Sequence, residues 1–209
     1  LIAWALVLFI RARAGQRTLT LELAVRRHHW VQACAQGAVF FWWGRYVDQV
    51  YAFAPFIAAQ LVFAYGVDAL LQWSRRENYQ LGFGPFPIIF SINLFLWFKP
   101  EWFHWQFAMI LLGYLGKELI RWTKDGRSAH IFNPSSFPLG VCSLVLIATG
   151  MTEITWGQEI AQSQYNPPYI YAVIFLASIP GQLLFGVATM TVWAVVSAYT
   201  FGLGYFWIT

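Results

Sequence analysis

Apolar residues occur along this chain in long continuous runs that are separated by short polar or charged stretches. Most runs approach the roughly 20 residues that a helix needs to cross a bilayer, and they lack the residue-by-residue alternation of membrane barrel strands. Residues 169–209 are about twice the length of one span, which leaves open one long kinked helix or two helices broken at Pro180–Gly181. The pattern predicts a partial span at 1–10 and further spans at 30–47, 50–73, 82–98, 102–122 and 134–148.

Composition places the chain among membrane proteins. It is 59% hydrophobic, 20% aromatic and 11% charged, with a mean hydropathy of +0.54, whereas soluble domains carry about a quarter charged residues. We therefore expect an all-α fold, a polytopic transmembrane helical bundle of seven or eight spans that forms a single domain over residues 1–209. Because the chain starts and stops inside apolar runs, we also expect it to be a fragment of a longer protein.

Basic residues gather in every other connection between the predicted spans. Eleven of the 13 lysines and arginines lie in three such connections, and only Arg45 and Lys99 lie in the intervening ones. Because basic loops stay on the inner side of a membrane, the loops at 11–29, 74–81 and 123–133 are expected in the cytoplasm of a bacterium and the loop at 151–168 outside its inner membrane. The same bias accounts for the net charge of +4, so the charge gives no reason to expect a nucleic-acid partner.

The remaining features of the sequence include no recognisable catalytic constellation. Residues 18–25 place leucines among polar residues and are expected to lie along the membrane interface. Cys34 and Cys142 lie in apolar runs and are interpreted as buried small side chains, neither a disulfide nor a metal pair. The sequence contains no CxxC, HExxH, GxSxG or Walker loop, so we predict no catalytic residue and no metal site.

One candidate pocket follows the charged turn at 124–127. Asn133 and Pro134 form a helix-start signal, with Asn as the N-cap and Pro at the first helical position. Ser135 and Ser136 would then lie beside backbone N–H groups that have no partner within the helix. Such a helix start can face an anion or a cofactor, so His130, Asn133, Ser135 and Ser136 are the candidate cofactor-binding residues.

Ionisable residues inside predicted spans are a second set of candidates, because they are costly there and usually functional. Asp68, Lys117 and Glu118 are therefore candidates for an ion or proton path. The alternative for Asp68 is an ion pair with a basic loop residue, and the alternative for Lys117 is a side chain that reaches the cytoplasmic surface. Glu118 follows Lys117 directly and must point to a different face of the helix, where a buried role is expected.

The segment Lys117–Gly140, in which Phe-Asn-Pro-Ser opens an outward helix at Phe132–Ser135, resembles a known family. It is similar to the first repeat of the NqrB/RnfD family, the membrane electron-transfer subunits of the sodium-pumping NADH:quinone oxidoreductase and of the Rnf complex. The outer turn at Lys99–Trp102 and the Met151-Thr152 pair before Trp156 fit the same pattern. The longer strings His-Ile-Phe-Asn-Pro-Ser and Trp-Gly-Gln-Glu-Ile resemble a branch associated with enediyne clusters, and the resemblance covers about residues 30–156.

This resemblance implies a five-helix repeat architecture similar to urea and ammonium channels, here one repeat plus part of a second. It also implies a flavin, FMN or riboflavin. Family members carry FMN covalently on a threonine in a Ser/Asp-Gly-Ala-Thr type loop, and that context is absent here around Thr149, Thr152, Thr155 and Thr189. The covalent attachment therefore carries over to no residue of this chain.

The leading functional hypothesis is an inner-membrane subunit of an electron-transfer complex, whose partners are the lipid bilayer and other subunits of that complex. A small-solute or ion transporter is the first alternative, with helices that begin at Pro85–Pro87 and Asn133–Pro134 as discontinuous elements around a pathway. A structural accessory subunit of a larger, pigment-containing complex is the second alternative.

Overall fold

The structure is a computed structural model that describes residues 1–124, 126–165 and 169–208. Within these residues the chain is mostly helical, as predicted. Two short 3-10 helices, at Pro100–Trp102 (η1) and Thr152–Ile154 (η2), supplement the α-helices. The α-helices are α1 Ile2–Ala14, α2 Arg27–Gly44, α3 Asp48–Arg75, α4 Pro85–Asn93, α5 His104–Leu119, α6 Ser136–Thr149, α7 Gly157–Tyr165, α8 Ile170–Phe185 and α9 Ala188–Ile208.

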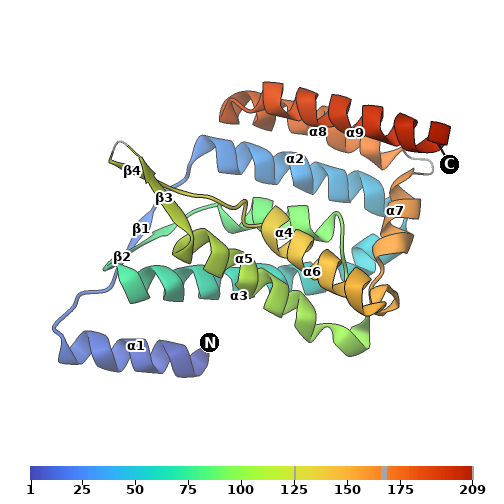
Figure 1. The fold of residues 1–209 in the computed structure, drawn as a ribbon. Helices are drawn as coiled ribbons and strands as arrows, with labels where there is room; N and C mark the ends of the chain where they lie inside the picture. Colours follow the sequence, from blue (N-terminus) through green and yellow to red (C-terminus); the bar gives the residue numbers. More distant parts are fainter. Residues whose placement is uncertain (125, 166–168, 209) are drawn as a thin grey trace.

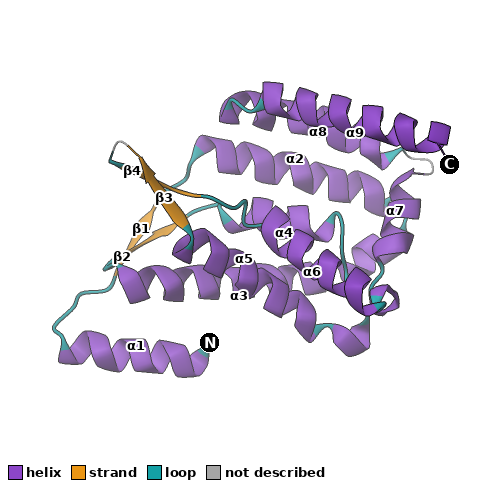
Figure 2. Ribbon diagram, in the orientation of Figure 1, coloured by secondary structure: helices purple, strands orange, loops and turns teal. Residues whose placement is uncertain are grey.

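The long helices lie roughly side by side, so the bundle has two distinct ends (Figure 1). Helix α3 packs against α4 and α5, α5 packs against α6, and α2 connects this group to α8, which carries α9 on its outer side. Helix α1 lies along α3 (Figure 1). The strands and the basic connections gather at one end, called the sheet end below, and α7 lies at the other (Figures 1 and 2).

Two small sheets at the sheet end were not predicted. Strand β1 (Thr20–Leu23) pairs in parallel with β2 (Asn78–Leu81), and β3 (Arg121–Lys124) forms an antiparallel hairpin with β4 (Arg127–His130). Residues 20–23 of the segment expected along the membrane interface therefore form a strand, and the interfacial position of 18–25 stays a prediction. Gly126, with a φ of 73°, supplies the left-handed backbone that the hairpin turn needs.

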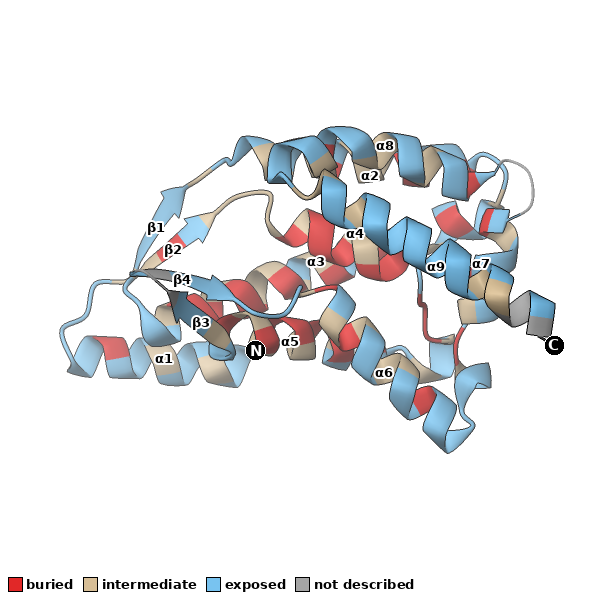
Figure 3. Ribbon diagram, turned by 45° about the horizontal axis from the view of Figure 1, so that its top comes forward, coloured by how far each residue is buried: buried red, intermediate tan, exposed pale blue. Residues whose placement is uncertain are grey.

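The core lies between α2, α3, α4 and α5, whereas α1, α6, α8 and α9 are largely exposed (Figure 3). Trp43, Val67, Ile89, Ile110 and Tyr114 are among the fully buried side chains of that core. The exposed helices nevertheless carry large apolar side chains on their outer faces. Relative exposure reaches 70% at Leu144, 70% at Trp193 and 80% at Phe201.

Several predicted boundaries are wrong, each for a local reason. The span expected at 82–98 contains only the nine residues of α4, because side chains take over the backbone bonds that follow it: Gln106 accepts from Phe98 N and donates to Leu96 O. The described part of 169–209 forms two helices, α8 and α9, but the break falls at Gly186, whose φ of 66° ends α8, and Pro180 lies inside that helix.

The external loop expected at 151–168 is largely ordered into η2 and α7. Its last part, Asn166–Pro168, lies outside the described residues, as do Asp125 of the predicted charged turn and Thr209. Both cysteines are free, but Cys34 is exposed where burial was expected. An apolar residue on the outward apolar face of a helix need not be buried within its own chain.

Among the described residues, one helix is long and apolar enough to cross a bilayer, namely α3 with its 28 residues. A second span is reached only if α7 and α8 are counted together, while α6 and residues 188–204 of α9 are shorter apolar helices. The seven or eight spans expected from the sequence therefore remain a prediction.

Candidate functional site

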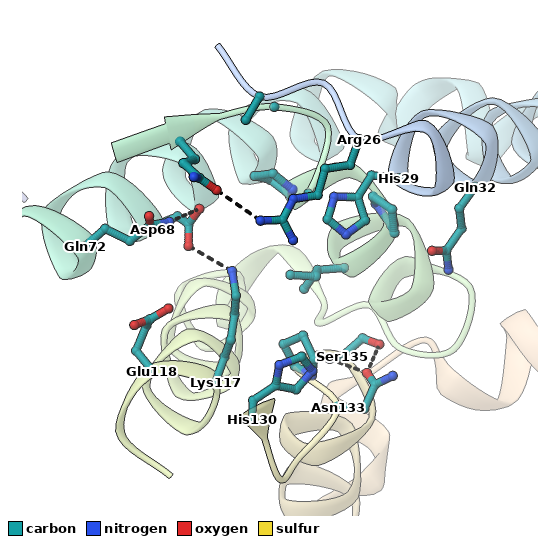
Figure 4. A pocket seen from close by; sticks show the side chains of 18 of the residues that line it. Arg26, His29, Gln32, Asp68, Gln72, Lys117, Glu118, His130, Asn133 and Ser135 are labelled. Atoms are coloured by element: carbon teal, nitrogen blue, oxygen red, sulfur yellow. Dashed lines mark hydrogen bonds and ion pairs between the residues drawn. The ribbon is translucent and has the colours of Figure 1, made fainter. Parts of the chain in front are cut away.

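A cavity of about 380 Å³ opens among the polar side chains at the sheet end of the bundle (Figure 4). Its walls come from the entry to α2, the last turns of α3, the start of α4, the end of α5, and the segment between β4 and α6. The cavity brings together six of the seven candidate residues named from the sequence, and Ser136 is the one that does not line it. The six are Asp68, Lys117, Glu118, His130, Asn133 and Ser135.

Asp68 and Lys117 form an ion pair across the cavity between α3 and α5. Lys117 Nζ lies 3.0 Å from Asp68 Oδ1, and Gln72 Nε2 donates to the other carboxylate oxygen at 3.1 Å. The ammonium group also lies 5.1 Å from the centre of the Tyr114 ring. Asp68 was expected to pair with a basic loop residue, but its partner, Lys117, lies on helix α5. The same bond keeps Lys117 inside the bundle instead of at the surface.

Glu118 forms a second, separate ion pair on the neighbouring face of α5. Its side chain is 3% exposed, and Oε2 accepts from Arg76 Nη2 at 3.0 Å. Arg121 approaches the other oxygen at 3.9 Å, while its own guanidinium is fixed by bonds to Ser128 on the hairpin. Lys117 and Glu118 thus serve two different pairs, as expected for adjacent residues of one helix.

The Asn133 side chain caps the backbone N–H groups at the start of α6. Its Oδ1 accepts from Ser135 N at 2.9 Å, from Ser136 N at 3.2 Å and from Ser135 Oγ at 2.7 Å. The helix begins at Ser136, two residues later than predicted, because Pro134 and Ser135 form a turn before it. The N–H groups that the sequence offered to a ligand are therefore already bonded to Asn133.

His130 lies at the mouth of the cavity, at the end of β4 (Figure 4). The residue is exposed over much of its surface, yet its pKa is lowered from the usual 6.5. Partial burial is the main cause, and the positive charges of Lys117 and Arg121 add to it, while Glu118 opposes them. The imidazole is therefore neutral at pH 7 and can accept or donate a hydrogen bond without adding charge.

Sequence reasoning missed several lining residues, above all Arg26, His29 and Gln32 at the entry to α2. Arg26 donates to Gln80 Oε1 at 3.0 Å, and this neutral amide is its only hydrogen-bonding side-chain partner in the described part of the chain. Taken from the sequence alone, the adjacent basic and histidine residues at 26–29 are most simply an interfacial cluster. Their spacing of three residues, which places Arg26, His29 and Gln32 on one side of the chain entering α2, is the signal that could have found them.

Charge is unevenly distributed around the cavity. Among the described residues, four cationic side chains line it against two carboxylates: Arg26, Arg76, Lys117 and Arg121 against Asp68 and Glu118. Together these six groups carry a formal charge of +2. The arrangement therefore favours a ligand with an anionic or electron-rich part.

A covalently bound flavin does not fit this site. Thr149, Thr152, Thr155 and Thr189 are all absent from the cavity lining, and the hydroxyl groups of Thr149 and Thr155 donate to backbone carbonyls of their own segments. A non-covalently bound group fits better, because the lining offers guanidinium donors. No group of three or more metal-binding side chains occurs among the described residues.

Comparison with known proteins gives no assignment: no family model, no curated protein and no solved structure matches this chain.

Proposed function

We propose that the chain is a multi-pass subunit of an electron-transfer complex in a bacterial inner membrane, and that the basic cavity holds a redox ligand non-covalently. The excess of cations over carboxylates around the cavity is the observation that carries this proposal. The resemblance of the Phe-Asn-Pro segment to membrane flavin subunits agrees with it, since Asn133, Pro134 and Ser135 line the same cavity.

The exposed apolar helices support the membrane part of the proposal. Leucine, tryptophan and phenylalanine side chains that are more than two-thirds exposed on α6, α8 and α9 need a lipid or protein environment, because soluble surfaces rarely present such large apolar patches. The basic connections lie together at the sheet end (Figure 1). This is the arrangement that the positive-inside rule requires of cytoplasmic loops.

The residues of the chain would have distinct roles toward the ligand. Arg26 is the most available cation, since it is bonded only to a neutral amide, and it would contact the anionic part directly. Lys117 and Arg76 are held by Asp68 and Glu118, so they would set the positive potential of the site. A flavin bound there would supply the electron-accepting chemistry, and a positive surrounding favours a ligand that gains negative charge on reduction.

The test is the visible absorption spectrum of gently purified protein, followed by acid precipitation. Flavin bands that move to the supernatant support the proposal, whereas flavin retained in the pellet would contradict non-covalent binding. In a titration with FMN, Arg26→Gln should weaken binding about tenfold or more, since it removes one charge-assisted contact. Arg27→Gln removes the neighbouring charge, which does not line the cavity, and should leave binding unchanged. A colourless protein that binds no added FMN would refute the proposal.

Transport of a small solute is the second candidate, and one observation favours it. Two short helices, α4 with nine residues and α6 with 14, begin at the cavity wall, where Gly84, Pro85 and Ser135 line it. Broken helices that start at a binding site are typical of secondary transporters. Uptake of a labelled solute into proteoliposomes without any redox partner would favour transport. Co-purified subunits with neither flavin nor uptake would instead favour an accessory role.

A further inference from the structure

A second cavity, of about 420 Å³, lies next to the first between α2, α8 and the start of α9. Its chemistry differs from that of the basic cavity: no charged residue lines it among those the structure describes. Apolar side chains form much of the wall, and the polar lining groups are amides and hydroxyls. The apolar lining includes Val39, Leu94, Ile174 and Ala177.

The two cavities share three lining residues, Gln32, Asn133 and Phe185, which come from three different parts of the chain. Phe185 is the last residue of α8 and is followed by the left-handed Gly186. Its ring lies 4.9 Å from the His28 ring and 6.5 Å from the His29 ring, centre to centre. A ring at the end of a helix therefore forms part of the wall between a charged compartment and an uncharged one.

One residue that lines the second cavity, Gln36, has a hydrogen-bond acceptor without a partner among the described residues. Gln36 donates from Nε2 to Ser91 Oγ at 2.8 Å, but its buried Oε1 has no partner among the described residues. Gln182 and Thr191 on the opposite wall are bonded to each other. A buried carbonyl oxygen without a donor costs free energy, and Gln36 carries that cost in the wall of the second cavity.

We propose that the two cavities form one elongated site for an amphiphile, with an anionic head in the basic cavity and an uncharged chain in the second. This inference rests on the proposed function only in taking the basic cavity as a ligand site. The head would contact Arg26 within the positive potential that Lys117 and Arg76 set, and the chain would pass Phe185 to lie between α2 and α8. Cations on one side and an uncharged, partly apolar lining on the other match the two halves of such a molecule.

Gly181 provides a way to fill the second cavity alone. It lies inside α8, lines the second cavity but not the first, and a Cβ atom built on it would meet no atom within 4 Å. Gly181→Leu therefore places a branched side chain in the space that the chain of the amphiphile would occupy. Gly140→Leu is the matched control, because Gly140 is another helical glycine with open space around it and lines neither cavity.

The experiment measures binding of inorganic phosphate and of ethyl, n-butyl and n-hexyl phosphate to the protein in lipid nanodiscs. Each methylene that leaves water should tighten binding about threefold to fourfold, so hexyl phosphate should bind on the order of 10²-fold more tightly than ethyl phosphate. In Gly181→Leu this gain with chain length should disappear, while the affinity for inorganic phosphate stays within about twofold of the unaltered protein. Gly140→Leu should keep the gain.

Three results would overturn the inference. Equal affinities for all four phosphates in the unaltered protein would show that the second cavity takes no part in binding, and would leave the basic cavity as a ligand site. A gain with chain length that survives in Gly181→Leu would place the chain elsewhere. Absence of binding by all four phosphates would refute anion binding in the basic cavity itself, which is the failure of the proposed function.

Discussion

The pair formed by Asp68 and Lys117 should contribute measurably to stability, unlike the ion pairs at the surface. Attraction across its 3.0 Å separation is roughly 5 kcal/mol at an effective dielectric constant of about 20, and removal of both ions from water offsets much of it. The side chains are 6% and 23% exposed, so the pair lies between a buried pair and an exposed one. We expect Asp68→Asn to lower the free energy of unfolding by about 2–3 kcal/mol.

The assay is a double-mutant cycle on Asp68→Asn and Lys117→Gln, measured by reversible unfolding in mixed micelles. The cycle should give a coupling free energy of about 1.5–2.5 kcal/mol, because each single substitution leaves the other charge without its partner. Arg17 and Glu77 supply the control: their atoms lie 3.6 Å apart with side chains 37% and 59% exposed, so their coupling should be below about 1 kcal/mol. Equal coupling in the two cycles would refute the reasoning.

Three further predictions follow from the cavity, the helix packing and the proposed topology. Because the pKa of His130 is lowered in the folded protein, the unfolded state binds a proton at higher pH than the folded state does, so stability is lost as pH falls below about 6.5. His130→Gln should flatten this part of a curve of unfolding free energy against pH, and an unchanged curve would contradict the lowered pKa of His130. Gly113→Ala should destabilise by about 1–3 kcal/mol, since its Cβ would lie 2.3 Å from a backbone oxygen of the segment before α6, whereas Gly140→Ala, with open space around it, should have no destabilising effect on thermal unfolding. In a cysteine-free background, a membrane-impermeant maleimide should label Glu153→Cys in intact cells and Thr123→Cys only after lysis, and the reverse pattern would invert the topology.

The sequence was a good guide to where helices lie, because a helix is the one structure in which a long apolar run can form its backbone hydrogen bonds within itself. Helices α2, α3, α5 and α6 begin within about three residues of the predicted spans. The helix ends were less predictable, since they depend on side chains from outside the helix itself. The Gln106 side chain bonds to the backbone of Leu96 and Phe98 after α4, and no feature of residues 82–98 predicts these bonds.

The strands were also unpredictable from the sequence, because their pairing depends on residues far away along the chain. Thr20 pairs with Asn78, 58 residues away, and a four-residue strand has too few side chains to show an alternating pattern. The candidate site was partly predictable because polar residues at the ends of neighbouring helices that share one end of a bundle must meet there. Arg26 and Gln32 could not be placed there from the sequence, because a basic cluster at the start of an apolar run is most simply a membrane-surface feature.

Asn133 shows how a correct local signal can point to the wrong chemistry. The Asn-Pro sequence does mark the start of α6, but the carboxamide oxygen that makes it a good cap also occupies the N–H groups of Ser135 and Ser136. A ligand in the cavity therefore finds no free helix terminus there, and its anionic part must be bound by side chains instead. Of the four cations present, two are held directly by buried carboxylates and Arg121 is fixed by Ser128. Arg26 is bonded only to the neutral amide of Gln80 among the described side chains, so its guanidinium is the one most available to a ligand. Its substitution is therefore the sharpest test of the site.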